Sequence, residues 1–88
     1  MQRVIVSAAA WDTPEKAHEA LAQALAFPDY YGGNLDALHD CLTDLSDTQL
    51  VITDCGAASK QMGKWPGFLS VFCDAAEENP GLKIRLTP

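Results

Sequence analysis

No basic residue occurs between Lys16 and Lys60 in this chain of 88 residues. The whole sequence has six lysines and arginines against twelve acidic residues, which gives a formal net charge of -6. This balance argues against nucleic acid and anionic membrane as direct partners, because both repel an acidic protein. The interval without bases holds seven acidic residues: Glu19, Asp29, Asp36, Asp40, Asp44, Asp47 and Asp54. The middle of the chain therefore carries charge of one sign.

The sequence also lacks long apolar runs, internal repeats and linkers. No run approaches the ~20 apolar residues that a membrane-spanning helix needs. The first six residues carry one charge and a short apolar run, which predicts a first strand rather than a secretory signal. We therefore expect a cytoplasmic protein. A chain of this length with 48% hydrophobic residues is expected to form one small domain, residues 1–88, around a single core.

Cysteine is scarce, and its spacing excludes two common frameworks. Cys41, Cys55 and Cys73 are odd in number and contain no C-x-x-C pair. Neither a set of disulfides nor a zinc knuckle is indicated. The expectation is free, mostly buried thiols, which fits a reducing compartment.

Hydrophobic periodicity predicts strands that alternate with helices. We expect strands at residues 3–8, 49–54 and 82–86, with the first buried and the second apolar on both faces and therefore central. Helices are expected at residues 14–26, 35–45 and 65–78, with a short helical turn within 56–63. In the last helix the predicted core side chains are Phe68, Leu69, Phe72 and Ala76. This order favours an α/β fold with a small parallel sheet and helical crossovers.

The predicted second helix has two different faces. Asp36, Asp40 and Asp44 are four residues apart and share one face. The leucines at positions 35, 38, 42 and 45 form an apolar stripe that points elsewhere. Like charges at this spacing repel by about 0.2–0.5 kcal/mol per pair. Such a face either keeps the protein soluble or attracts a cationic partner, and the spacing alone leaves both interpretations open.

Two tyrosines precede this helix on a loop next to Gly32 and Gly33. Tyrosine is favoured at protein interfaces because it offers a large contact area at a low entropy cost. It is also intermediate in burial, so the sequence alone leaves Tyr30 and Tyr31 each divided between core packing and partner contact.

Residues 28–42, P-D-Y-Y-G-G-N-L-D-A-L-H-D-C-L, closely resemble the central motif of the barstar family, roughly P-x-Y-Y-G-x-N-L-D-A-L-W-D-C-L. A weaker similarity covers residues 71–75, V-F-C-D-A, against V-F-x-[DE]-A. The resemblance implies a single small α/β domain in which helices pack against a three-stranded parallel sheet. Members of that family are intracellular inhibitors of small basic ribonucleases of the barnase type, whose active site they block with the second helix and the loop before it.

Carried over by position, the resemblance places Asp40 where the substrate phosphate binds. It implies that Asp36 pairs with bases at the cleft rim, and that Tyr30 contacts the edge of the active site. Gly32 would let the loop backbone come close to the enzyme, and Asp74 would form a peripheral acidic contact. The predicted partner-binding set is Tyr30, Tyr31, Gly32, Asn34, Asp36, His39, Asp40, Asp44 and Asp74.

Three positions depart from the family pattern. His39 replaces a usual tryptophan, Asp44 a frequent glycine, and Leu45 a common aromatic residue. These departures concern the identity of the target more than the mode of binding. Two alternative targets therefore stay open: another nuclease toxin, for which the chain would be an immunity protein, and a basic protein that is not a nuclease.

Catalysis and metal binding are the remaining alternatives. His39, Asp40 and Cys41 are consecutive, so on a helix their side chains point about 100° apart and cannot form a hydrogen-bonded triad. Asp36, His39 and Asp40 have a spacing that places three ligands on one side of a helix, but the metal shell is incomplete. We therefore expect no enzyme activity, metal or cofactor, and a monomer when the protein is free.

Overall fold

A three-stranded parallel sheet and four helices make up the protein, and the computed structural model describes all residues from 1 to 88. The elements follow one another as β1 (Gln2–Ser7), α1 (Pro14–Leu25), α2 (Leu35–Thr43), β2 (Thr48–Thr53), α3 (Cys55–Gln61), α4 (Trp65–Glu78) and β3 (Leu82–Leu86). β2 lies in the centre and pairs in parallel with both neighbours. The predicted α/β fold with a parallel three-stranded sheet is confirmed.

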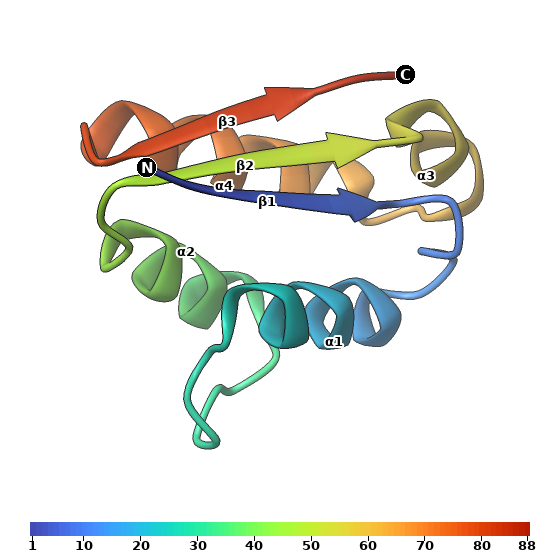
Figure 1. Cartoon of the computed structure of the whole chain (residues 1–88). Coiled ribbons are helices and arrows are strands. Elements are labelled where there is room, and N and C mark those ends of the chain that lie inside the picture. The colour runs from blue at the N-terminus through green and yellow to red at the C-terminus, as the bar shows by residue number, and fades with distance from the viewer.

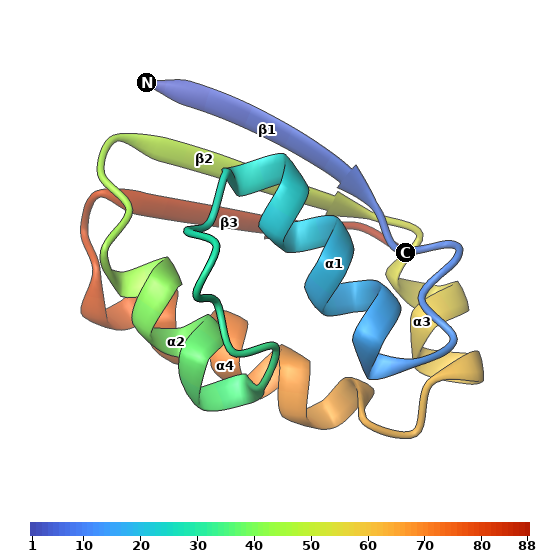
Figure 2. The same ribbon diagram turned by 90° about the horizontal axis from the view of Figure 1, so that it is seen from below.

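The three long helices lie on one side of the sheet. The strand order in the sheet, β1-β2-β3, is the same as the order along the chain. Parallel crossovers are almost always right-handed, so two crossovers in the same direction place their helices on the same face. Figure 1 shows α1 and α2 beneath the strands, and the view from below in Figure 2 shows α1, α2 and α4 side by side.

The core forms between this helical layer and the inner face of the sheet. Leu50 and Ile52 of β2 are fully buried, as are Leu21, Leu38 and Leu42 from the helices. Burial of one such side chain contributes about 1.5–3 kcal/mol. The leucine stripe of α2 therefore faces inward, as the sequence predicts, with Leu35 and Leu45 half-buried at its two ends.

β1 differs from the buried strand that the sequence predicts. It is an edge strand paired only with β2, and the side chain of Ile5 is 61% exposed. Val6 faces the core and is buried, whereas Arg3, Ile5 and Ser7 point to the other face. A short apolar run does not reveal which face of a strand the helices leave open.

The core side chains of α4 also differ in part from the prediction. Trp65, Phe68, Phe72 and Ala75 are buried, at helical spacings of three and four residues. Leu69 lies one position beyond this stripe and is exposed, and Ala76 is only half-buried. The predicted bounds of the helix are correct, but the prediction of Leu69 and Ala76 as core residues is wrong.

α2 ends two residues earlier than predicted because a distant side chain caps it. Nδ2 of Asn79 donates to the carbonyl oxygens of Leu42 at 3.0 Å and Leu45 at 2.7 Å. The last carbonyls of a helix have no partner within the regular helix, and Asn79 supplies one here, in addition to the weak 3.3 Å contact of Leu42 with the N–H of Leu45. Asp44 is consequently the C-cap residue and not part of the helix interior.

Smaller differences concern the other boundaries and the cysteines. β1 and β2 each begin and end one residue before the prediction, α1 stops at Leu25, and α3 is a helix of seven residues. Ala26 ends α1 in the left-handed region with φ 54°.

All three cysteines are free, but Cys73 is exposed and the other two are half-buried, so the predicted burial is wrong for Cys73. None of the helices combines the length and the hydropathy required to cross a membrane.

Candidate functional site

The acidic side chains of α2 lie on the solvent side of the helix. Asp36, Asp40 and Asp44 are exposed, while Leu38 and Leu42 beneath them are fully buried. No lysine or arginine forms an ion pair with any of the three carboxylates. Asp36 lies in the first turn, where the helix dipole favours a negative charge. Asp40 and Asp44 have no such compensation, so this end of the helix presents uncompensated negative charge to solvent.

The two tyrosines of the preceding loop have different positions. Tyr30 is 87% exposed. Tyr31 is half-buried, and its ring packs against Phe27 with centroids 4.9 Å apart. The hydroxyl group of Tyr31 is hydrogen-bonded to Nδ1 of the buried His18 at 2.6 Å. Tyr31 therefore anchors the loop to α1, while Tyr30 is free to contact another molecule.

Burial changes the acidity of both members of this hydrogen bond. It raises the pKa of Tyr31 to about 12, and the nearby Cys41 adds a smaller contribution. Burial lowers the pKa of His18, and the charge of Glu15 partly opposes that shift. Both groups are therefore neutral near pH 7, and the loop anchor is an uncharged hydrogen bond.

The residues between the tyrosines and α2 fix the start of the helix. Oδ1 of Asn34 accepts a hydrogen bond from the backbone N–H of Ala37 at 2.8 Å, so this side chain serves as the helix cap. Gly33 has φ +64°, which favours glycine. At Gly32 a Cβ atom would lie 3.2 Å from Nδ2 of Asn34, so a side chain there would press on the cap.

A hollow of about 380 Å³ lies between the end of α1, the tyrosine loop and the end of α2. Its walls are mostly apolar and include Phe27, Pro28 and Leu45. Tyr30, Asp40 and Asp44 also line it. The structure thus brings together three of the residues that the sequence nominates, around a concave surface with carboxylates among its apolar walls.

His39 contacts α4. Its Nε2 donates a hydrogen bond to Oε2 of Glu78, and its Nδ1 lies 3.9 Å from a carboxylate oxygen of Asp40. The hydrogen bond to Glu78 raises the pKa of His39, and the charges of Asp40 and Asp74 act in the same direction. Asp74 therefore lies near enough to belong to the same acidic surface. We define the acidic face as Asp36, Asp40, Asp44, Asp74 and Glu78.

Glu78 is the residue of this face that sequence reasoning missed. It follows Asp74 by four residues and so lies on the same side of α4. That spacing was the only available signal. The pairing with His39 depends on how α2 and α4 pack together. Residue spacing within α4 carries no information about that packing.

The arrangement around Cys41 does not resemble that of an activated nucleophile. Burial raises the pKa of its thiol, and the charges of Asp44 and Asp40 raise it further. A reactive cysteine needs the opposite shift, because only the thiolate attacks. The ring of His39 is held by Glu78 rather than by Cys41.

The side chains also do not assemble a metal shell. No group of three or more histidine, cysteine or acidic side chains is arranged to hold a metal ion. Nε2 of His39, one of the atoms a metal would need, is bonded to Glu78.

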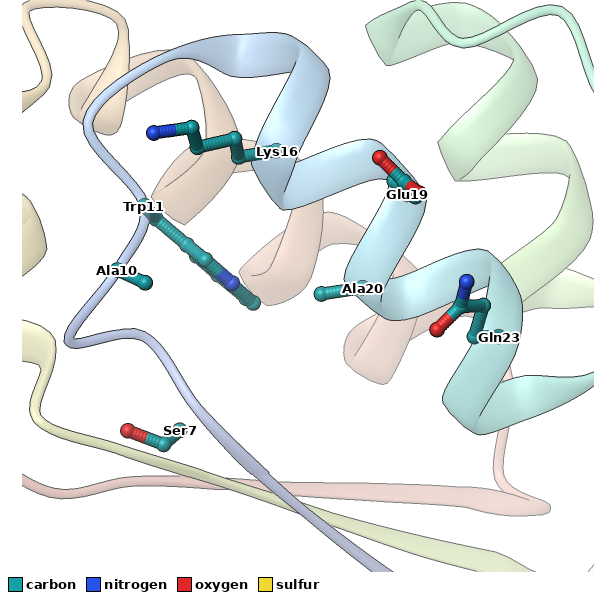
Figure 3. Close-up of a pocket in the computed structure, with 7 residues that line it drawn as sticks. All are labelled: Ser7, Ala10, Trp11, Lys16, Glu19, Ala20 and Gln23. Atoms are coloured by element: carbon teal, nitrogen blue, oxygen red, sulfur yellow. The ribbon is translucent and has the colours of Figure 1, made fainter.

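A second hollow, of about 260 Å³, lies away from the acidic face between β1 and α1. Figure 3 shows the indole of Trp11 reaching across it towards Ala20, with Lys16, Glu19 and Gln23 along the helix. Nζ of Lys16 is already paired with Asp12 at 2.9 Å. Nothing in this hollow continues the chemistry of the acidic face.

The sequence matches a known protein family and a named relative. A family model described as "Barstar (barnase inhibitor)" matches residues 1–87. A protein of Bacillus subtilis (strain 168) named "Putative ribonuclease inhibitor YrdF" is 44% identical over 52 residues, which is 59% of this chain. The match covers 57% of that relative, little more than half of its length.

Proposed function

The chain belongs to the barstar family, and from this premise we propose that it inhibits a small basic ribonuclease of the barnase type. In this proposal residues 1–88 act as one inhibitor domain that covers the active site of the enzyme and catalyses nothing itself. The observation that carries the proposal is the acidic face, whose exposed carboxylates have no lysine or arginine partner within the chain.

Carboxylates suit this task because a ribonuclease binds a polyanion. Its cleft presents arginine, lysine and histidine side chains to the phosphates of RNA. Aspartate oxygens accept paired, charge-assisted hydrogen bonds from arginine and can replace phosphate oxygens there. We assign the central position to Asp40, whose side chain is 84% exposed, and supporting contacts to Asp36, Asp44 and Asp74.

Tyr30 and the hollow beside it supply the apolar part of the surface. The exposed ring offers a large, rigid contact area next to Asp40 and Asp44. Tyr31, Gly32 and Asn34 act through the shape of the loop, because their contacts lie within the chain. His39 lies between the carboxylates, so the protonation state of its ring changes the net charge of the acidic face.

We also propose a cytoplasmic location. Three free thiols, one of them exposed, suit a compartment in which glutathione and thioredoxin keep cysteines reduced. An inhibitor located there would protect the RNA of the cell that makes the ribonuclease.

The test is the affinity of the purified chain for a barnase-type ribonuclease, measured by calorimetry and by inhibition of RNA cleavage. We expect Asp40→Ala to weaken binding by about 2–5 kcal/mol, since it leaves buried cations of the enzyme without a partner. Asp36→Ala and Asp74→Ala should lose less.

Glu19→Ala is the matched control, because it removes the same charge from an exposed position on α1 beside the second hollow, away from the acidic face. It should bind as tightly as the unchanged chain. If Asp40→Ala binds as well as Glu19→Ala does, the proposed binding surface is wrong. If no barnase-type enzyme binds while another nuclease toxin or a basic non-nuclease does, the surface stands and the target changes.

A further inference from the structure

The face of the sheet that points away from the helices is uncovered. Because the strand order follows the chain order, the right-handed crossovers place α1, α2 and α4 on one face only. Figures 1 and 2 show no element on the other side of the strands. Sheets made only of parallel strands normally carry helices on both faces. This protein therefore has a two-layer version of an architecture that usually has three layers.

The strand register identifies the side chains of this open face. Arg3, Gln49 and Lys83 are paired across the three strands and form one row. Ile5, Val51 and Arg85 form the next row. Arg3, Ile5, Lys83 and Arg85 are exposed, whereas Val51, on the central strand between them, is only 6% exposed.

The open face carries a charge opposite to that of the acidic face. It holds three of the six basic residues of the chain, Arg3, Lys83 and Arg85. None of them forms an ion pair. The nearest carboxylates along these strands belong to Asp47 and Asp54, which lie beyond the strand ends. The carboxylate of Asp54 accepts hydrogen bonds from Ser7 and Thr53. A strongly acidic protein thus has one surface of unpaired cations around an exposed isoleucine.

We propose that the open face of the sheet docks an acidic amphipathic helix of a partner protein. A helix is the element that covers a parallel sheet elsewhere, and it packs about 10 Å from the strands. Its apolar stripe would cover the exposed Ile5 above the buried Val51, and carboxylates along its two edges would reach Arg3 on β1 and Lys83 and Arg85 on β3. The occupant is thereby defined by its chemistry: one apolar stripe flanked by acidic residues.

The other occupants fit less well. Single-stranded RNA is held by stacking on aromatic rings, and the open face contains none. Two copies of the chain that met through this face would bring like charges together. An anionic membrane would attract the three cations but would repel the rest of a protein with a net charge of -6.

The proposal is independent of the ribonuclease, because the acidic face and the open face lie on opposite sides of the molecule. The test uses the full chain and a synthetic helical peptide of about 18 residues with a leucine stripe flanked by glutamates. Two control peptides keep the helix but replace either the glutamates by lysines or the leucines by serines. Binding is followed by shifts of the backbone amide NMR signals of β1, β2 and β3.

We expect the acidic peptide alone to bind, with shifts confined to the three strands, and to bind equally well when a ribonuclease occupies the acidic face. Arg85→Glu should weaken peptide binding about three- to tenfold. Lys64→Glu changes the net charge equally, on the exposed residue that precedes α4, and should change the affinity by less than about twofold. An Arg3→Glu variant gives an independent check should Arg85→Glu fold poorly.

Several results would overturn the proposal. The first is a set of backbone amide shifts that lies outside the three strands. The second is binding of the serine peptide as tight as that of the acidic peptide. The third is an equal loss of peptide affinity in Arg85→Glu and Lys64→Glu. Tighter binding of a uridine 12-mer or of phosphatidylserine vesicles than of the acidic peptide would also reject a helix as the occupant. Self-association that Arg85→Glu abolishes would assign the face to a second copy of the chain instead.

Discussion

His39 lies where one added proton changes the charge of the acidic face. Its imidazole is hydrogen-bonded to Glu78 and lies close to Asp40 and Asp74, so the folded protein favours the protonated ring. Because this pKa is raised, the stabilisation from the pair is fully present below the unfolded value of about 6.5. It is lost as the pH rises through the folded pKa.

Affinity for a basic ribonuclease should therefore fall as the pH decreases through the pKa of His39. The cause is that the protonated ring offsets the charge of the carboxylates around it. Calorimetry from about pH 5 to about pH 8 measures the affinity, and NMR titration of His39 gives its pKa. Glu78→Gln should move both midpoints to lower pH, because the group that raises this pKa is gone. A His39→Gln variant with an unchanged pH profile would show that the titrating group belongs to the enzyme.

Single residues also show what sequence reasoning can reach. The family motif nominated Tyr30 and Asp40, the spacing of the acidic residues added Asp44, and the structure places all three around one hollow. Residue type alone could not distinguish the burial of Tyr30 from that of Tyr31, because the difference arises from His18, which lies on another helix. Glu78 was missed for the same reason, since its role depends on the packing of α4 against α2.

α2 is positioned from both ends by side chains outside its own interior. Asn34 caps its start, and Asn79, which follows α4, caps its end. Oδ1 of Asn79 also accepts a hydrogen bond from the N–H of Gly81, so one amide connects the end of α2 to the turn before β3. The helices and strands were predictable from hydrophobic periodicity. The end of α2 was not, because Asn79 is far from it in the sequence.

Asn79→Ala should destabilise the fold by about 1–3 kcal/mol, because it removes hydrogen bonds to half-buried backbone groups. The last turn of α2 should exchange its amide hydrogens faster, and affinity for the ribonuclease should fall because Asp40 and Asp44 lie in that turn. Urea unfolding and hydrogen exchange measure these effects. Glu77→Ala is the control, since Glu77 is an exposed neighbour without a hydrogen bond or ion pair, and should have little effect. Equal stability of the two variants would contradict the assigned role of Asn79.

The molecule as a whole separates its charges. Carboxylates of α2 and α4 that have no lysine or arginine partner lie on the helical side, and three unpaired cations lie on the open face of the sheet. The net charge of -6 adds a long-range field that attracts any positively charged protein from a distance. The two-layer arrangement itself follows from the strand order, which the sequence predicted only as far as a central second strand.

Association with a basic ribonuclease should slow steeply as salt rises, while dissociation changes little. The reason is that the screening length falls from about 30 Å at 0.01 M salt to about 10 Å at 0.1 M. Stopped-flow fluorescence over this range measures the rates. A chain with Asp36, Asp40 and Asp44 all changed to asparagine should show a weaker salt dependence, whereas Lys83→Glu on the open face should retain it. A salt-independent association rate would exclude electrostatic steering.

The two sides of α2 have different roles: one side holds the helix in the fold, and the other side is exposed to solvent and available for binding. Leu38 and Leu42 hold the helix in the core, while the carboxylates that face outward contribute nothing to that packing. Substitutions on the outer side can therefore change what the protein binds without changing its scaffold, and directed evolution would begin from those few codons.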